Sequence, residues 1–312
     1  MKKLLTLILA LCMLFVLGAV SALAESEAEE KNNNTVDSSL ESPLDRDGTG
    51  TPVTSRIADA SQMTAVEDVV EESMKPVFAD ELQDGSYPIA VSCSSSMFRI
   101  EDCILTVAEG EMTAKLGMSS TSYGYLYPGT AEEAAEAEIE DYIVSEEREE
   151  GKSSFVFPVD ALDEAVCCAA WSRNRELWYD RTLVFRADSL PLEAFQNLTT
   201  AESLSLPDGE YTVSVTLGGG SGRAGVQSPC RLWIENDTAK AEIIWSSANY
   251  DYMIVNGEKI STEISDGHAV CIIPVAAFDR ALAVTADTTA MSQPHEIAYT
   301  LLFDASTIAP AS

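Results

Sequence analysis

A repeated aromatic stretch is the feature that most constrains the fold of this chain. Residues 119–126 read SSTSYGYL, and residues 246–253 read SSANYDYM. The same offset separates Cys103 from Cys230, and a Pro-Val pair with an aspartate shortly after it occurs at 158–163 and again at 274–279. The spacing is far longer than the roughly 20–50 residues of a solenoid unit. The sequence therefore predicts two paralogous domains.

The N-terminal 24 residues have the composition of a secretory signal peptide. Lys2 and Lys3 precede an apolar run at 4–17, and the Ala-Leu-Ala triplet at 22–24 is a small-x-small cleavage site. The apolar run is shorter than a membrane-spanning helix. We therefore expect export to the extracellular space or the cell surface, with no membrane span in the mature chain.

The net charge argues against one large class of partner. The chain has 51 acidic residues against 19 basic ones, a net charge of −32, and cleavage would remove two more lysines. Nucleic acids and anionic lipid surfaces are bound through basic patches, so neither is expected as a partner. The acidic runs at 132–141 and 146–150 lack the ligand spacing of a calcium loop, and we interpret them as solvated surfaces.

Short segments with alternating apolar and polar residues, separated by turn signals, fill most of the chain after residue 82. The two segments on either side of a Glu-Gly turn at 109–110 are expected to be antiparallel neighbours joined by a short loop. Residues 25–81 are instead rich in Glu, Asn, Ser and Thr, which is typical of a disordered stalk. We expect an all-β fold with two tandem immunoglobulin-like β-sandwich domains after the signal peptide and the acidic stalk. The expected boundaries are 82–191 for the first domain, 192–205 for a linker, 206–306 for the second domain and 307–312 for a tail.

Two short helices are expected in addition. The Thr-Ala-Glu-Glu stretch at 130–133 is a capping box, which predicts a helix to about Tyr142 with Ala135, Ile139 and Tyr142 facing inward. Residues 64–74 have apolar side chains near helical spacing, which predicts a second helix that would be marginal by itself.

Six cysteines follow the signal peptide, and the strand pattern turns four of them inward. Cys103 and Cys168 lie in the first domain, and Cys230 and Cys271 lie in the second. One core disulfide in each domain is one interpretation, and buried free thiols acting as small apolar side chains are the other. No Cys-x-x-Cys pair is present to indicate a structural zinc site.

Tyrosines are concentrated in the two repeated stretches. Residues two apart in an extended chain point the same way, so Tyr123, Tyr125 and Tyr127 are expected to line one surface, as are Tyr250 and Tyr252. Such a wall of rings suits a flat aromatic ligand, which it could stack against and hydrogen-bond. The other interpretation is that these rings close the end of the sandwich core.

The predicted last hairpin of each domain contains further candidate ligand residues. His295 precedes Tyr299 by four residues on the final strand, which places both on one face, and imidazole and phenolate are both iron ligands. The corresponding hairpin of the first domain contains Tyr179 and Arg181, whose guanidinium could pair with a ligand carboxylate.

The sequence contains few features that indicate an enzyme. It contains no His-Glu-x-x-His, no Gly-x-Ser-x-Gly and no phosphate-binding loop, and the first domain has no histidine to act as a general base. We therefore expect a binding protein and not an enzyme.

Six stretches of the two domains are similar to the iron-transport-associated, near-iron-transporter (NEAT) modules of Gram-positive surface proteins. They lie at 84–87, 123–130 and 178–183 in the first domain and at 245–253, 286–292 and 295–299 in the second, so the likeness covers about residues 82–190 and 206–306. The resemblance implies immunoglobulin-type sandwiches that take haem at one end. There a short turn with serine and aromatic residues covers the porphyrin, and a tyrosine of the last hairpin ligates the iron.

The resemblance implies the following residues of this chain. The covering residues are Ser119, Ser120, Tyr123, Tyr125, Tyr127, Ser246, Ser247, Tyr250 and Tyr252. The hairpin ligands that it implies are Tyr179 in the first domain and Tyr299 in the second. The chemistry of the side chains, as argued above, adds Arg181 beside Tyr179, and His295 as a haem-iron ligand beside Tyr299. NEAT hairpins usually show tyrosines four apart, whereas here His295 takes the partner position of Tyr299, and Leu183 follows Tyr179 at that spacing.

The sequence thus predicts an exported, non-enzymatic surface protein that binds haem or another iron carrier for iron acquisition, with Tyr299 and His295 of the second domain as the preferred iron ligands. A component of an iron-uptake transporter is a further expected partner. The alternative is an adhesion or envelope scaffold module whose tyrosine wall binds a protein or a glycan.

Overall fold

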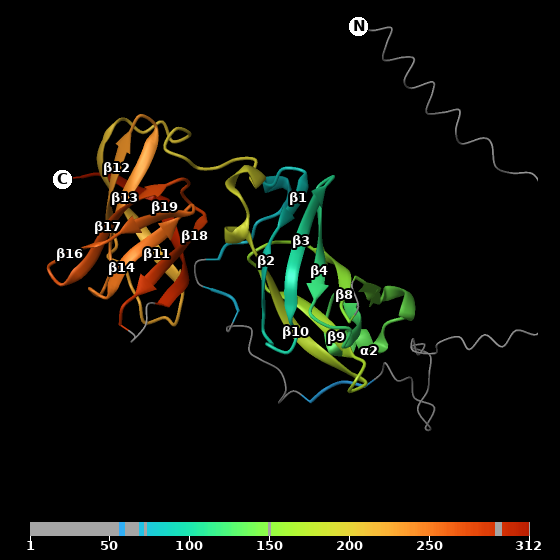
Figure 1. The fold of residues 1–312 in the computed structure, drawn as a ribbon. Coiled ribbons are helices and arrows are strands. Elements are labelled where there is room, and N and C mark those ends of the chain that lie inside the picture. The colour runs from blue at the N-terminus through green and yellow to red at the C-terminus, as the bar shows by residue number, and fades with distance from the viewer. Residues whose placement is uncertain (1–55, 60–68, 72–73, 149–150, 291–294, 312) are drawn as a thin grey trace, which may run out of the picture. The chain divides into compact units, whose positions relative to one another are not determined.

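The computed structural model describes residues 56–59, 69–71, 74–148, 151–290 and 295–311 (Figure 1). Strands dominate these residues, which confirms the expected all-β class. The expected signal peptide and most of the helix expected at 64–74 lie outside the described residues. Among the helices that are described, none has the length and apolar character needed to cross a lipid bilayer.

The first repeat, residues 74–198, forms two five-stranded sheets. Their strand orders are β1-β3-β4-β8-β7 and β2-β10-β9-β5-β6, and every strand pairing is antiparallel. The strands are β1 Gly85–Pro88, β2 Ala90–Cys93, β3 Ile100–Ala108, β4 Glu111–Met118, β5 Tyr123–Tyr127, β6 Ile143–Val144, β7 Glu146–Glu147, β8 Ser153–Val159, β9 Val166–Ser172 and β10 Leu177–Arg186.

The second repeat, residues 199–311, forms a single nine-stranded sheet with the order β15-β14-β18-β19-β11-β12-β13-β17-β16. Its strands are β11 Gly209–Gly219, β12 Cys230–Glu235, β13 Thr238–Ile244, β14 Tyr250–Val255, β15 Glu258–Ser261, β16 Glu263–Ser265, β17 His268–Val275, β18 Ala281–Thr288 and β19 His295–Pro310. When β1 and β2 are taken as the two halves of β11, the strand orders of the two repeats coincide. The repeat seen in the sequence is therefore a repeat of topology.

The first strand of each repeat is where the two repeats differ. In the first repeat Pro88 ends β1, because proline has no amide hydrogen to donate to a ladder. The next amide, that of Ile89, donates to the Cys103 carbonyl, and Ala90 then begins β2 in the other sheet. In the second repeat β11 continues through this point with a bulge between Thr212 and Ser214, so one strand joins both halves of the sheet.

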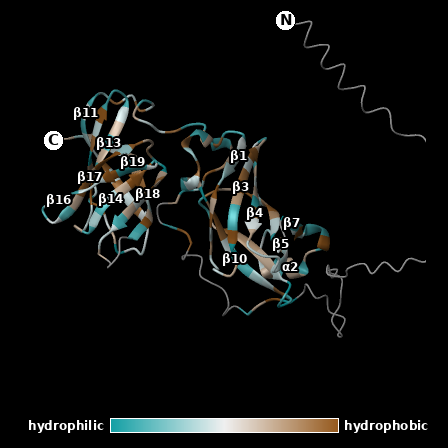
Figure 2. Ribbon diagram, viewed as in Figure 1, coloured by the Kyte–Doolittle hydropathy of each residue, from teal (hydrophilic) through white to brown (hydrophobic). Residues whose placement is uncertain are grey.

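The hairpin β3–β4 shows how local sequence fixes this architecture. Glu109 and Gly110 have φ of 55° and 81°, the conformation of a tight hairpin turn that glycine favours at its second position. Buried and exposed residues alternate over residues 102–108 and 111–116. Figure 2 shows hydrophobic and hydrophilic residues mixed along the strands of this repeat. The hairpin predicted from this alternation and from the Glu-Gly turn is confirmed.

Each repeat has its own hydrophobic core. Phe98, Phe155, Phe157 and Phe185 are among the fully buried rings of the first core, and Trp245, Phe278 and Phe303 are among those of the second. The expected linker at 192–205 does not stand free of these cores. Ala194 and Phe195 are buried in the first core, and Ala201 is buried in the second.

The predicted helix after β5 is present but shorter than expected. Helix α2 spans Ala131–Glu136, and its capping box is formed: the Glu133 amide donates to Thr130 Oγ1 at 3.2 Å, and the Thr130 amide donates to Glu133 Oε2 at 2.8 Å. A separate 3-10 turn follows at Ile139–Asp141. Ala131, Ala134 and Tyr142 are buried around Trp178 in a third, smaller cluster.

The described parts of the segment expected to form a stalk pack against the first repeat. The Ala58 amide donates to the Trp178 carbonyl at 2.8 Å, and the Trp178 amide donates to the Arg56 carbonyl at 2.9 Å. Strand β2 pairs only with the later part of β10, so residues 56–58 satisfy backbone groups that β2 leaves uncovered. Further along, Val77, Ala79 and Leu82 are buried in the first core.

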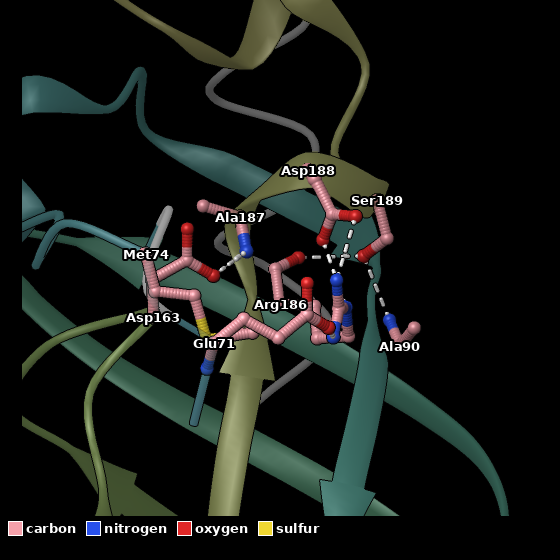
Figure 3. A network of polar contacts seen from close by, with 8 residues as sticks. All are labelled: Glu71, Met74, Ala90, Asp163, Arg186, Ala187, Asp188 and Ser189. Carbon is pink, nitrogen blue, oxygen red and sulfur yellow. Dashed lines mark hydrogen bonds and ion pairs between the residues drawn. The ribbon is translucent and has the colours of Figure 1, made fainter. Parts of the chain in front are cut away.

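A second contact of the expected stalk is drawn in Figure 3. Arg186 Nη1 lies 2.6 Å from Glu71 Oε1, while its Nε lies 3.0 Å from Asp188 Oδ1. Ser189 Oγ accepts from the Ala90 amide and donates to the Arg186 carbonyl. The arginine therefore ties an upstream segment to the end of β10.

Candidate functional site

The candidate site is the end of each repeat where two elements meet. One is the serine turn, residues 119–122 in the first repeat and 246–249 in the second, and the other is the last hairpin, β9–β10 or β18–β19. In the first repeat the Arg173 amide donates to the Ser122 carbonyl at 2.9 Å. In the second repeat the Thr289 amide donates to the Asn249 carbonyl at the same distance. The two elements that the resemblance implies for ligand binding are thus adjacent in both repeats.

The serines of this turn hold its backbone in place. Ser120 Oγ accepts from the Ser122 amide, and Ser247 Oγ accepts from the Asn249 amide at the equivalent position. Ser246 Oγ accepts from the Gly225 amide at 3.1 Å. Ser119, the remaining predicted covering serine, is half-buried, and its amide donates to the Arg99 carbonyl.

A β-bulge at the same place in both tyrosine stretches changes the direction in which the rings face. The strand register shifts between Tyr123 and Tyr125. A bulge adds one residue to a strand, so residues two apart across it need not share a face. Tyr123 lies in the first core, where the centroid of its ring is 5.0 Å from that of Phe98. Tyr125 and Tyr127 instead pack around Tyr142, in the smaller cluster on the other side of the sheet. The expected single wall of three tyrosines is therefore wrong.

The second repeat separates its tyrosines in the same way. The register shifts between Tyr250 and Tyr252. Tyr250 is buried in the core and stacks on Trp245 with ring centroids 4.0 Å apart. Tyr252 is half-exposed, and its hydroxyl donates to Glu296 Oε1 at 2.7 Å.

Tyr299, the expected iron ligand, is a core residue in this structure. Its side chain is 4% exposed, and its hydroxyl lies 3.2 Å from that of Tyr250. Burial, together with the hydrogen bond to Tyr250, raises the pKa of the Tyr299 phenol well above its usual range. His295 is exposed at the start of β19, and four residues of strand separate the two Cα atoms by about 13 Å. The structure does not bring these two side chains together.

The strand registers also revise which residues of the two hairpins correspond. Arg181 pairs with Cys168 across β9–β10, and Tyr299 pairs with Val284 across β18–β19. The amide of the aspartate after each Pro-Val pair donates to a phenylalanine carbonyl, Asp163 to Phe185 and Asp279 to Phe303. Each phenylalanine lies four residues after the residue in question, Arg181 or Tyr299. The structural counterpart of Tyr299 is therefore Arg181 and not Tyr179.

Arg181 is the main charged group at the site in the first repeat. It is 6% exposed, its Nη1 donates to the Asp180 carbonyl at 2.7 Å, and its buried Nε finds no acceptor among the residues that the structure describes. The guanidinium carbon lies 4.9 Å from the centre of the Tyr179 ring, and Tyr179 itself is half-exposed. The structure thus brings together the two hairpin residues predicted for the first repeat.

The neighbouring thiols do not neutralise this charge. Cys168 is the register partner of Arg181, and Cys93 lies close enough for the guanidinium to act on its thiol. Burial raises the pKa of both thiols above their ordinary value of 9.0. Both are therefore uncharged at neutral pH.

The structure contains free cysteines and no core disulfide. All six cysteines after the predicted signal peptide are unpaired. In the second repeat β13 lies between the strands of Cys230 and Cys271. Two strand spacings amount to about 9.6 Å, which exceeds the Cα separation that a disulfide spans. The disulfide interpretation therefore fails, and the buried-thiol interpretation holds in this structure.

Sequence reasoning missed one buried acid in the second repeat. Asp287 is 1% exposed and lies in register between Tyr252 and Glu296. Within the described part of the chain, neither of its carboxyl oxygens has a hydrogen-bond partner. Burial, with the nearby Asp251 carboxyl, raises its pKa. The signal in the sequence was a charged residue at the end of the apolar run of β18. The equivalent position in the first repeat is occupied by Trp171.

Comparisons with known proteins leave the site to be judged on its geometry. No protein-family model matches the chain, and a search of curated proteins found no match. In the ranges that the structure describes, no group of three or more His, Cys, Asp or Glu side chains is placed to hold a metal ion.

Proposed function

We propose that this chain is an exported, non-enzymatic protein that binds haem or another iron carrier in iron acquisition, through two tandem immunoglobulin-like sandwiches. The observation that supports it best is the hydrogen bond between the serine turn and the last hairpin, made at the same place in both repeats. The NEAT-like resemblance implies a porphyrin site between these two elements. Equal strand orders and separate cores support the tandem-sandwich part of the proposal.

The first repeat is the stronger candidate for the ligand. Its hairpin presents a half-exposed phenol at Tyr179, whereas the second repeat buries Tyr299 against Tyr250 and Trp245. A phenolate can ligate ferric iron only if the ligand reaches its oxygen. Tyr179 meets this condition, whereas the Tyr299 hydroxyl is already hydrogen-bonded to that of Tyr250.

A visible-absorption titration of haemin into residues 25–312 tests the proposal. We expect a saturable Soret band, with the charge-transfer feature of phenolate-bound ferric haem, that Tyr179→Phe abolishes. Tyr299→Phe is the matched control, since it removes a hydroxyl from the other repeat and should leave the spectrum intact. A spectrum identical to that of free haemin would reject the proposal. Loss of the charge-transfer feature in Tyr299→Phe alone would show that the iron is bound by the second repeat.

An adhesion or scaffold role is the second candidate, and one observation favours it. An open hollow of about 910 Å³ is lined by residues of β12, β13, β16 and β17. Two isoleucines that line it, Ile264 and Ile272, are 60% and 50% exposed. Exposed apolar side chains around a hollow are typical of surfaces that bind a protein or a glycan.

Glycan arrays and immobilised envelope proteins, probed with the wild type and with Ile272→Lys, would test this second candidate. Val156→Lys is the matched control, because Val156 is 45% exposed at the equivalent position of the first repeat. Binding that only Ile272→Lys abolishes would favour the scaffold role. Binding that neither variant changes would exclude the hollow as its site.

A further inference from the structure

Strand β10 places a charged side chain where its alternation calls for an apolar one. Leu183 and Phe185 point into the first core and are fully buried. Arg181 is two residues before Leu183, so it lies on the same face of the strand, at the end of that core. The guanidinium is therefore at the boundary of an apolar interior, where an unpaired charge is costly.

The groups nearest to Arg181 leave its charge without an ion pair. The neighbouring thiols of Cys93 and Cys168 are neutral, and the negatively charged carboxylate of the adjacent Asp180 accepts instead from the Ala131 amide of helix α2. Although the chain has 51 acidic residues, no ion pair to Arg181 is formed among the described residues. The guanidinium has a carbonyl and an aromatic ring as partners, and it has no anion.

The hydrogen-bonding edge of the guanidinium that remains free has a specific shape. Nη1 is used by the Asp180 carbonyl, and Nε is buried with no acceptor. Nε and Nη2 form one side of the planar group and present two parallel N–H bonds. A carboxylate matches this edge with both of its oxygens. The missing partner is therefore best supplied by a carboxylate.

The second repeat shows how the same position is filled when no anion is needed. Its counterpart of Arg181 is Tyr299, whose neutral hydroxyl is satisfied by the hydroxyl of Tyr250. The equivalent of Tyr250 in the first repeat is Tyr123, whose hydroxyl points to the Met97 carbonyl at 3.5 Å. The two repeats thus differ at this site by one positive charge that has no ion-pair partner among the described residues.

We infer that the first repeat recognises its ligand through a carboxylate that pairs with Arg181, while the ring of Tyr179 contacts an aromatic part of the same ligand. The inference rests on the proposed function, since a porphyrin with propionate side chains is such a ligand. It adds that the anchor is the carboxylate and that only the first repeat provides it. The ligand class is a flat aromatic carboxylic acid.

The test compares haemin with haemin dimethyl ester, whose propionates are blocked, on wild type, Arg181→Gln and Arg181→Lys. We expect the ester to bind the wild type about 10- to 100-fold more weakly than haemin, as the loss of a charged hydrogen-bonded pair predicts. Arg181→Gln should lower the affinity for haemin to the affinity that the wild type has for the ester, and Arg181→Lys should restore part of it. Arg231→Gln, at an exposed arginine of the second repeat, is the control and should change nothing.

A third probe, naphthalene-2-carboxylate, separates failure of this inference from failure of the iron-carrier proposal. If haemin and its ester bind equally and Arg181→Gln has no effect, iron-carrier binding stands and the carboxylate anchor is rejected. If haemin does not bind but naphthalene-2-carboxylate raises the melting temperature of the wild type and not of Arg181→Gln, the anchor stands and the iron function is rejected. If neither probe binds, the carboxylate anchor and the iron-carrier function are both rejected.

Thermal unfolding of each variant checks that it is folded. If Arg181→Gln does not fold, the comparison of wild type with Arg181→Lys still tests the anchor.

Discussion

Replacing Asp163 with asparagine should stabilise the protein at pH 8 and leave its stability at pH 4 unchanged. Asp163 is 7% exposed, its amide donates to the Phe185 carbonyl, and its Oδ1 accepts from the Ala187 amide at 2.8 Å (Figure 3). Burial raises the pKa of this carboxyl from its ordinary value of 3.8 to about 6. The protonated form is therefore favoured in the folded state.

The magnitude follows from this displacement of the pKa. A change from 3.8 to about 6 corresponds to about 3 kcal/mol of free energy of unfolding. The folded state holds more protons than the unfolded state between these two values, so stability due to Asp163 is fully present below about pH 4 and is lost as the pH rises through 6. Asparagine keeps the acceptor for Ala187 and tolerates the φ of 54°. Because it has no charge to bury, Asp163→Asn should gain up to about 3 kcal/mol at pH 8.

Asp279→Asn provides a matched control within the same chain. Asp279 is the equivalent residue of the second repeat, with a φ of 59°, an amide that donates to the Phe303 carbonyl and an Oδ1 that accepts from Ala305. It is exposed, so its charge is not buried on folding. Urea unfolding followed by circular dichroism between pH 4 and pH 8 would measure both variants. An Asp163→Asn effect that is the same at every pH, or that destabilises at pH 8, would refute the burial argument.

Two further outcomes follow from the buried groups of the site. Tyr299→Phe should lower the free energy of unfolding by about 1–2 kcal/mol in urea titrations, because it leaves the buried Tyr250 hydroxyl without its partner; unchanged stability would show that the two hydroxyls do not bond. Ellman's reagent should detect six thiols in denatured residues 25–312 and should react first at exposed Cys167 in the folded protein. A total of two or four thiols would instead demonstrate disulfides.

Elements set by nearby residues were predicted well. The turn at Glu109 and Gly110 and the capping box at Thr130 depend on contacts within a few residues, and both are present where the sequence predicts them. The length of the helix was overestimated, because Ile139 and Tyr142 pack through a separate 3-10 turn and not through a continued α-helix. Helical spacing alone does not distinguish these two paths of the backbone.

Some contacts at the candidate site follow the sequence-based expectation, and others do not. The serine turn and the last hairpin do meet, and Tyr179 and Arg181 do lie together. The bulges that follow Tyr123 and Tyr250 turn the next tyrosine side chain to the other face of the sheet. A bulge is defined by the pairing between two strands, so the sequence of one strand does not predict it. For the same reason, the correspondence between Arg181 and Tyr299 could be read only from strand register.

The sequence by itself determined the all-β class, the internal repeat and the positions of most strands, since these depend on alternation and turn residues within one segment. The tertiary structure alone decided which tyrosines enter the cores, that the cysteines stay unpaired, and that Arg181 is buried without an anion. These features depend on which strand lies beside which and in what register. That information arises from contacts between residues distant in the chain, so no local pattern contains it.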